Sequence, residues 1–402
     1  MWSDAGAAVA AAHRAEWAHV LAATVRVARD LDLAEEAVQD AYVQALGTWD
    51  EQGVPDKPGA WLTTAARRNV LNALQRQRTL AAKLPLLVVE EPDTSATDDR
   101  LRLVFTCCHP ALAVEAQVAL TLRLLCGLTT PEVASALLVT ESTMAARITR
   151  AKKKIAIARI PYAVPEPDQL PARVGAVLTV IHLLYSAGHT AHAGHDLQRA
   201  DLGDRALDLA RMLRVLLPRE PEVAGLLALL LIHHARRAGR TDAAGRLLRL
   251  EDQDRTAWDR TAIAEADRLI TASLTAAAPG RFTLQAAIAA LHAQAPAYAE
   301  TDWPQIRLLY DQLLTIWPSP VVALNRAVAV SMAEGPAAAL ALVEDLERDG
   351  RLAGYHYLPA TKADLLRRLG RHNEAAAAYA AALAGTENAA EREFLAARID
   401  DL

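Results

Sequence analysis

Apolar residues recur at helical spacing along most of the chain, so the hydrophobic pattern predicts helices rather than strands. In the N-terminal part it predicts helices at roughly 10–29, 33–48 and 57–79. Val38, Tyr42 and Leu46 are expected to share the apolar face of the second helix. The intervening segment 53–59 holds two glycines and two prolines, which predict a loop. In the third helix, the residues expected to pack inward are Trp61, Leu62, Ala65, Val70, Leu71 and Leu74.

Residues 128–155 predict a short helix, a tight turn and a second helix. Thr129 or Thr130 is suited to cap the first helix, with Pro131 in its first turn. Thr140 is suited to cap the second helix. The residues of the second helix that recur at core spacing are Met144, Ile148, Ala151 and Ile155. This is the outline of a helix-turn-helix, the fold element that places its second helix in the major groove of DNA.

The outward face of that second helix is polar and basic. Four side chains near its start are placed to meet base edges: Ser142, Thr143, Arg147 and Arg150. Lys152, Lys153 and Lys154 follow them and are candidates for phosphate contacts. Glycine is common in the turn of this motif, but the chain carries Leu138 there. A solvated basic helix is the simpler alternative, but the caps, turn and core spacing together favour the DNA-binding interpretation.

A second basic stretch precedes this motif. Residues 64–83 hold five basic side chains and no acidic one, whereas the whole chain has a formal net charge of −5. Charge is therefore segregated, and a polyanion responds to the local patches rather than to the overall charge. Guanidinium and amide groups on this predicted helix suit contacts with bases and phosphates. The candidate side chains are Trp61, Arg67, Arg68, Asn69, Asn72 and Arg76.

The composition limits the remaining possibilities. Hydrophobic residues make up 52% of the chain and aromatic residues only 4%, so alanine and leucine supply most apolar surface, as in all-helical proteins. Three cysteines do not suggest a disulfide framework, and the run Cys107-Cys108-His109 has no second ligand pair at finger spacing. The N-terminus shows no secretory signal. The run 226–232 is too short to span a bilayer. We therefore expect a cytoplasmic protein without a membrane segment or bound metal.

The predicted organisation has three parts and a linker. The first helical domain covers 10–82, a linker covers 83–98, and the domain with the helix-turn-helix covers 99–160. From 172 to 402 the pattern predicts helix pairs, clearest at 357–384 and repeated at 321–346, with a weaker echo at 238–250. Gly335 and Gly370 lie 35 positions apart, close to the tetratricopeptide period of about 34. An irregular helical domain without true repeats is the alternative.

The order of these motifs resembles bacterial RNA polymerase sigma factors of the extracytoplasmic-function class, within the sigma-70 family. Residues 30–46 resemble region 2.2, whose polar face docks on the polymerase clamp helices, and Gln39 and Asp40 match the contacting positions. Residues 57–78 resemble regions 2.3 and 2.4, which melt and read the −10 element. Residues 112–155 resemble region 4, which reads the −35 element. The segment 105–112 is typical of the subgroup with a helical extension.

The resemblance implies an all-α protein in which two small DNA- and polymerase-binding domains precede a tetratricopeptide-like domain. Its implied partners are core RNA polymerase and promoter DNA, both double-stranded and melted, with no cofactor and no catalysis by the chain itself. The C-terminal domain is expected to regulate this activity, through a regulatory protein or an intramolecular contact.

Two other functions fit parts of the sequence. A one-component regulator would combine a helix-turn-helix with a sensing tetratricopeptide-like domain, but it would leave the motifs of 33–78 unexplained. A metal-dependent enzyme would use His189, His192 and His195, with His233 and His234 downstream. No carboxylate at a known metalloenzyme spacing supports the second function.

Overall fold

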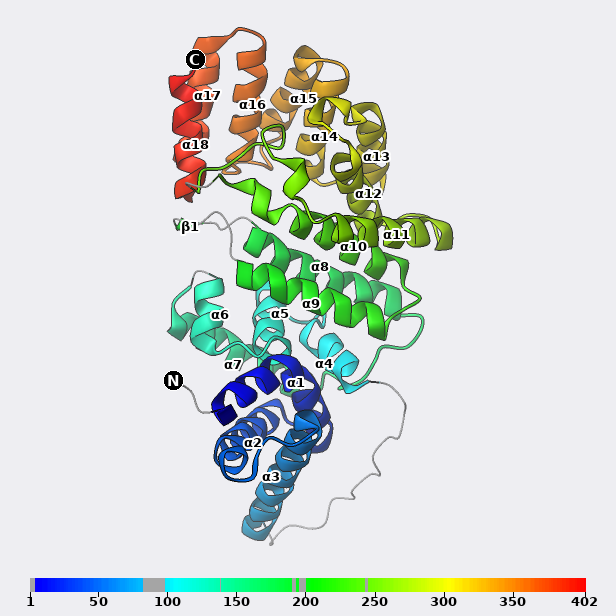
Figure 1. The fold of residues 1–402 in the computed structure, drawn as a ribbon, viewed down its shortest axis with the longest axis vertical. Coiled ribbons are helices and arrows are strands. Elements are labelled where there is room, and N and C mark those ends of the chain that lie inside the picture. Colours follow the sequence, from blue (N-terminus) through cyan, green and yellow to red (C-terminus); the bar gives the residue numbers. More distant parts are fainter. Residues whose placement is uncertain (1–3, 82–97, 138, 190–192, 195–199, 243–244) are drawn as a thin grey trace. The chain divides into compact units, whose positions relative to one another are not determined.

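The structure, a computed structural model, describes residues 4–81, 98–137, 139–189, 193–194, 200–242 and 245–402. The regular structure of these residues is helical except for a two-residue parallel pairing of β1 (Ala193–Gly194) with β2 (Glu387–Asn388). The prediction of an all-α protein is confirmed. The chain divides into two compact units, Met1–Leu183 and Leu184–Leu402, whose helices are labelled in Figure 1. Of the predicted linker 83–98, only Asp98 lies within the described residues.

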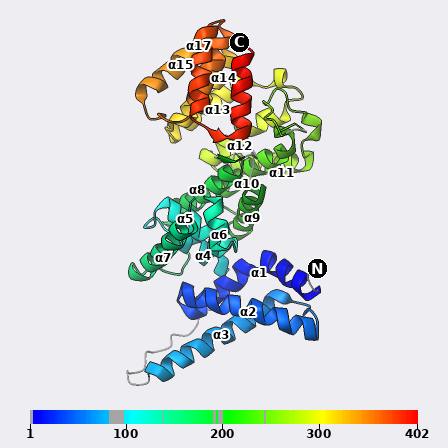
Figure 2. The ribbon, with the colours of Figure 1, turned by 90° about the vertical axis from the view of Figure 1, so that its left-hand side faces the viewer.

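The first three helices pack against one another as a small bundle. They are α1 (Asp4–Ala28), α2 (Leu31–Gln52) and α3 (Pro58–Ala81). Asp30 caps α2 by accepting a hydrogen bond from the backbone N–H of Leu33 at 2.8 Å. Gly53 ends α2 with a φ of +84°, a conformation that favours glycine. In the views of Figures 1 and 2, the C-terminal half of α3 extends beyond α1 and α2.

Two of the apolar residues predicted to face this core do not. Val38, Tyr42, Leu62 and Val70 are buried, but Leu46 is 43% exposed and Leu71 is 58% exposed. Leu46 follows Ala45 and Leu71 follows Val70, and both of these preceding residues are fully buried. Because Trp49 is buried one turn beyond Leu46, the packing continues along α2, and the predicted apolar face was offset by one position at Leu46 and at Leu71.

The second group of helices completes the first unit. It comprises α4 (Asp99–Cys107), α5 (Val114–Leu120), the π-helical turn η1 (Thr121–Leu125), α6 (Thr130–Ala136) and α7 (Glu141–Ile157). It packs on α1 through α4 and η1, and the Trp17 indole N–H donates to the Leu124 carbonyl of η1 at 3.0 Å. Gly127 lies so close to this contact that an added Cβ would sit 2.9 Å from His13 and 3.0 Å from Trp17.

The helix α8 (Leu170–His189) runs from the first unit into the second. By length and composition alone it could cross a bilayer, a test that core helices of soluble proteins also pass. Val177, Leu178 and Ile181 are among its buried side chains. The shorter apolar run 226–232 lies in a different helix, α10 (Pro221–Ala235).

The second unit consists of helices joined mostly by short turns. After α8 come α9 (Ala200–Leu216), α10 (Pro221–Ala235), η2 (Arg237–Arg240), η3 (Arg255–Ala257), α11 (Arg260–Ala276), α12 (Arg281–Gln294) and η4 (Tyr298–Glu300). They are followed by α13 (Trp303–Ile316), α14 (Pro320–Ala333), α15 (Pro336–Asp349), α16 (Tyr357–Arg368), α17 (His372–Ala384) and α18 (Ala389–Asp400). Each helix from α13 to α18 packs on the next in the chain (Figure 1).

Two of the three predicted helix pairs are present. Gly335 separates α14 from α15 and Gly370 separates α16 from α17, with φ angles of +101° and +74° that favour glycine. The weak echo at 238–250 is wrong. There η2 leads into a turn with an isolated bridge between Thr241 and Leu247, and described residues 245–250 contain no helix. The Ala-Gly-Arg sequence at 238–240 was therefore not sufficient evidence for a helix pair there.

A buried histidine gives this unit a testable pH dependence. Burial, together with the charges of Arg236 and Arg255, lowers the pKa of His292 to about 4. An unfolded histidine has a pKa of about 6.5, so below that pH the unfolded chain binds a proton that the folded chain does not. Stability should therefore fall as the pH drops from about 6.5 to about 4, by roughly 1.4 kcal/mol per pH unit.

Urea unfolding at a series of pH values measures this effect. His292→Gln should flatten the pH dependence over that window, whereas His372→Gln, at an exposed position, should leave it unchanged. Parallel curves for the wild type and His292→Gln would contradict the assignment.

Candidate nucleic-acid interface

The helix-turn-helix forms as its local signals predict. Thr129 caps α6 in a capping box: its hydroxyl accepts from the Glu132 N–H, and the Glu132 carboxylate accepts from the Thr129 N–H at 2.6 Å. Thr140 caps α7 by accepting from the Thr143 N–H at 3.3 Å. The four predicted core positions of α7 are buried: Met144, Ile148, Ala151 and Ile155. Leu138, in the turn, lies outside the described residues.

The opposite face of α7 carries most of the predicted DNA-contacting side chains. Ser142, Thr143, Arg150, Lys153 and Lys154 are exposed, and Arg147 is half-buried. The Thr140 hydroxyl lies within hydrogen-bond distance of both Ser142 and Thr143, which fixes their hydroxyls near the helix start. The arrangement leaves guanidinium groups near the N-terminal half and ammonium groups behind them. Contact of these residues with DNA stays a prediction.

Lys152 points elsewhere. Its side chain is 12% exposed, and its ammonium group lies 2.6 Å from Asp32 and 2.8 Å from Glu35 on α2. Burial lowers the pKa of Lys152, but the Glu35 charge and the hydrogen bonds to both carboxylates outweigh burial, so the pKa is raised. In this arrangement Lys152 joins α7 to α2, and the ammonium group would have to leave these carboxylates to reach a phosphate.

Glu35 is the centre of this ion network, which the sequence analysis missed. Its carboxylate is 6% exposed and also pairs with the Arg123 guanidinium of η1. Asp32, by contrast, is 76% exposed. Glu35 lies on the same buried face of α2 as Leu31 and Val38. An acidic residue within an apolar face is a signal for a buried cationic partner, although the sequence does not identify that partner.

The basic face of α3 is largely accessible. Arg68, Asn72 and Arg76 are exposed, and Arg67 is half-buried. Leu71, the apolar residue that failed to join the core, lies among them. Arg68 donates to the Gln44 side chain of α2 at 3.4 Å, and α3 continues beyond α1 and α2 in Figure 2, so an extended ligand could lie along its exposed side chains.

Two half-buried side chains among the predicted contacts on α3, Asn69 and Trp61, also have structural partners. The Asn69 amide donates to the Ala37 carbonyl at 3.2 Å, and its oxygen accepts from Gln44 at 3.2 Å, so Asn69 ties α3 to α2. Trp61 packs edge-on against Trp49 with ring centroids 5.7 Å apart. Both side chains are half-buried, and their direct contact with DNA stays a prediction.

The exposed face of α2 differs in charge and polarity from the basic faces of α3 and α7. Gln39 and Asp40 are exposed, and Val43 and Leu46 are 66% and 43% exposed on the following turns. An acidic and amide pair followed by two exposed apolar side chains suits a protein partner better than a polyanion. The prediction that Gln39 and Asp40 contact polymerase is consistent with this placement but is not tested by it.

Comparison with known proteins finds two family matches in the first unit. Residues 15–79, which hold α2 and most of α3, match the family described as Sigma-70 region 2. Residues 102–155, which include the helix-turn-helix, match Sigma-70, region 4. The chain belongs to the sigma-70 family. This sigma factor therefore carries the regions for promoter recognition in the order that its sequence predicted.

The C-terminal part of this sigma factor matches a third family over part of its length. Residues 173–274 match a family of unknown function, DUF6596. The chain is also similar to an uncharacterized protein, R00370, from Rhizobium meliloti (strain 1021), with 43% identity over 394 residues. That match covers 95% of this chain and 93% of the relative, so the C-terminal extension is shared. No solved structure matches the chain.

The histidine cluster proposed for a metal lies partly outside the described residues. His189 ends α8, whereas His192 and His195 are not among the residues that the structure describes. Within the described ranges, no three His, Cys, Asp or Glu side chains are grouped as metal ligands. His189 instead packs against Tyr185 and His233, with ring centroids 5.7 Å and 5.1 Å away.

Proposed function

We propose that this sigma factor binds core RNA polymerase through the exposed face of α2 and directs it to promoters through α3 and α7. The observation that carries the proposal is the presence, in one chain, of an acidic and apolar docking face and two separate basic helices. The polymerase supplies the chemistry, and the chain supplies the sequence preference. The protein would act in the cytoplasm, where polymerase and promoter DNA are found.

In this proposal α7 reads the −35 element. Arg147 and Arg150 would meet base edges in the major groove, where arginine bonds guanine bidentately. Lys153 and Lys154 would bind phosphates, so promoter affinity should fall steeply with salt. Ser142 and Thr143, held by the Thr140 cap, would add hydrogen bonds near the helix start.

The role proposed for α3 is to open and read the −10 element. Arg68, Asn72 and Arg76 offer hydrogen-bond donors to the separated strand, and Leu71 offers an apolar surface to an unstacked base. Taking a base out of the stack costs a few kcal/mol, which contacts with sigma and polymerase must offset. Asn69 and Trp61 would support this surface by holding α3 against α2.

The ion network around Glu35 suggests how the contacts of Lys152 differ between the free protein and the protein bound to polymerase and DNA. We infer that Lys152 stays paired with Asp32 and Glu35 until polymerase and DNA separate α7 from α2. Lys152 would then become available to a phosphate, as its position beside Lys153 and Lys154 in the sequence suggests.

For the C-terminal unit we propose a regulatory role, exerted through a partner protein or through the chain itself. Progressive C-terminal truncation tests this role, and unchanged transcription and polymerase affinity would argue against it. A one-component regulator remains the second candidate function, because a helix-turn-helix followed by a helical domain also fits that class. That candidate leaves the region 2 match without a role.

Polymerase binding gives a direct test of the docking face. The double variant Gln39→Ala, Asp40→Ala should weaken binding of the labelled chain to core polymerase roughly thirtyfold, the effect of losing about 2 kcal/mol at an interface hot spot. Fluorescence anisotropy measures the affinity. Glu51→Gln, an exposed acid at the end of the same helix, is the matched control. Equal losses in both variants would mean that overall charge, rather than this face, determines binding.

A further inference from the structure

Two arginines of the second unit pack against one buried tryptophan. Arg236 directly follows α10 and Arg255 begins η3, and their guanidinium carbons lie 4.9 Å and 4.8 Å from the centre of the Trp258 ring. Trp258 is 3% exposed and Arg255 is 8% exposed, whereas Arg236 is half-buried. We call these three residues the Arg–Trp–Arg site. It is closed to solvent at Arg255 and Trp258 and reaches solvent at Arg236.

Each member of this site keeps a buried nitrogen that no other described residue accepts. These nitrogens are Nε of Arg236, Nη2 of Arg255 and Nε1 of Trp258. Arg255 is nevertheless fixed in place, because its Nη1 donates to the carbonyls of His292 at 2.5 Å and Ala295 at 2.8 Å. Arginine and tryptophan side chains carry hydrogen-bond donors and no acceptor. The site therefore suits a ligand that accepts hydrogen bonds.

The two guanidinium charges of the site are not balanced. Burial and the charges of Arg240 and Arg255 lower the pKa of Arg236 to about 10, and among the described residues no carboxylate opposes them. Burial and the Arg260 charge lower the pKa of Arg255, where the described chain again supplies no opposing carboxylate. Burying an unpaired cation is costly. An anion would remove this cost, whereas a water molecule would satisfy the donors only.

The acidic residues nearest to the site in sequence or in space serve other groups. Asp254 and Asp259 flank the η3 segment, but their carboxylates cap η3 and α11 by accepting backbone N–H groups. Glu391 acts on Arg240, which is held by the His189 carbonyl. With Arg240 balanced by Glu391, the remaining charge is that of the two arginines of the site.

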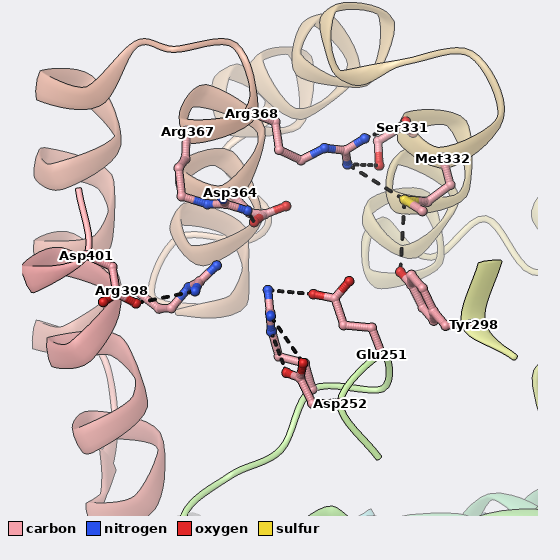
Figure 3. Close-up of polar contacts among 11 residues, drawn as sticks. Glu251, Asp252, Tyr298, Ser331, Met332, Asp364, Arg367, Arg368, Arg398 and Asp401 are labelled. Atoms are coloured by element: carbon pink, nitrogen blue, oxygen red, sulfur yellow. Dashed lines mark hydrogen bonds and ion pairs between the residues drawn. The ribbon is translucent and has the colours of Figure 1, made fainter. Parts of the chain in front are cut away.

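Other arginines of the second unit are paired with acids. Figure 3 shows Arg367 beside Asp364 and Arg398 beside Asp401, with nitrogen–oxygen distances of 2.8 Å and 3.6 Å. These pairs carry no net charge and give an anion no reason to bind. The Arg–Trp–Arg site differs from them because its charge and its hydrogen-bond donors are both unmatched.

We propose that the Arg–Trp–Arg site binds a small dianionic oxyanion, either a phosphate ion or the phosphate group of a small phosphomonoester. Such a group carries nearly two negative charges at neutral pH, which match the two guanidinium charges. Its oxygens accept hydrogen bonds from arginine forks in pairs. The pKa of His292, lowered to about 4, leaves that imidazole neutral, so it adds no third charge.

Other anions fit this site less well. A carboxylate would balance only one of the two charges. A nucleic acid also carries one charge per phosphate, and a duplex is too large to reach the buried donors of Arg255 and Trp258. The proposal does not depend on the promoter-binding role, because it concerns the second unit and is measured without polymerase or DNA.

Calorimetric titration of the full chain with inorganic phosphate tests the proposal. At neutral pH and at an ionic strength fixed with chloride, it should show saturable binding to one site, which acetate should not reproduce. Arg236→Gln should weaken this binding at least tenfold, the effect of losing a hydrogen bond to a charged group. The matched control is Arg367→Gln, which removes a paired arginine of the same unit and should leave the affinity unchanged.

The indole N–H signal of Trp258 in NMR spectra locates the binding. It is assigned by its absence in Trp258→Phe, and it should shift as phosphate is added. Glycerol phosphate distinguishes the two sources of the ligand: tighter binding than inorganic phosphate would support a phosphomonoester, and weaker binding would support the free ion. An unchanged Trp258 signal during saturable binding would place the anion elsewhere and overturn the proposal.

Thermal unfolding separates loss of binding from loss of the fold. At a hundredfold excess over its dissociation constant, phosphate should raise the Tm of the second unit by roughly 5–10 °C in the wild type, but not in Arg236→Gln. If Arg236→Gln does not fold, Arg236→Lys replaces it, since lysine keeps the charge but loses the planar fork. Absence of saturable binding, equal binding of acetate, or an equal loss in Arg367→Gln would each overturn the proposal.

Discussion

Glu35→Gln is expected to lower the free energy of unfolding of the N-terminal unit by about 3–5 kcal/mol. The substitution keeps the size of the side chain but removes the charge that two poorly exposed cations, Lys152 and Arg123, share. Removing one partner of a buried ion pair is costly because the other partner is left charged and unpaired. Urea unfolding monitored by circular dichroism measures the change.

Two further variants isolate the cause. Asp32→Asn should cost no more than about 1 kcal/mol, because the Asp32 carboxylate is largely exposed although it pairs with the same lysine. Replacing all three members with apolar residues, as Glu35→Leu, Lys152→Met and Arg123→Met, should recover most of the loss, since apolar packing can replace a buried ion network. If Glu35→Gln costs as little as Asp32→Asn, the network does not hold α7 against α2.

The second large effect concerns sequence readout by α7. The double variant Arg147→Ala, Arg150→Ala should reduce initiation at a cognate promoter roughly a hundredfold, because each guanidinium that contacts a base edge contributes about 1–3 kcal/mol of discrimination. Neither side chain belongs to the buried core of α7, so the helix should keep its fold. Initiation at promoters with an intact and a scrambled −35 element measures the effect.

The control for this prediction lies in the same basic stretch. Arg159→Ala removes one exposed positive charge beyond the end of α7 and should change initiation little. Lys153→Ala and Lys154→Ala should weaken binding at all promoters alike and should each reduce the slope of log affinity against log salt by about one. Equal behaviour of the arginine and lysine variants would argue against base readout by Arg147 and Arg150.

The elements that the sequence predicted best are those set by local chemistry. Thr129 and Thr140 cap their helices because a side-chain oxygen before a helix accepts a backbone N–H wherever the chain lies. Gly335 and Gly370 lie at helix ends, where the backbone adopts positive φ angles. Glycine tolerates these angles better than other residues do, so its position in the sequence marks the turn. Periodicity likewise located the core face of α7 at Met144 and Ile148.

Long-range contacts were harder to predict. Lys152 lies 117 positions from Glu35, and nothing in the spacing of either helix links the two residues. The sequence grouped Lys152 with Lys153 and Lys154 because all three are basic and adjacent, although helical geometry turns Lys152 toward the buried side. The apolar pattern predicted Leu46 and Leu71 in the core because it did not distinguish them from the preceding residues, Ala45 and Val70, which are the buried ones.

The candidate promoter-binding surface was therefore predicted more completely than the contacts that restrain it in the free protein.

Reconstituted transcription tests the central claim most directly. Purified core polymerase, this chain and fragments of the host genome should give transcripts with defined start sites, and those transcripts should disappear with the Gln39→Ala, Asp40→Ala variant. The account would be contradicted if the chain never associates with core polymerase, even after residues 184–402 are removed, or if transcription requires a different sigma factor.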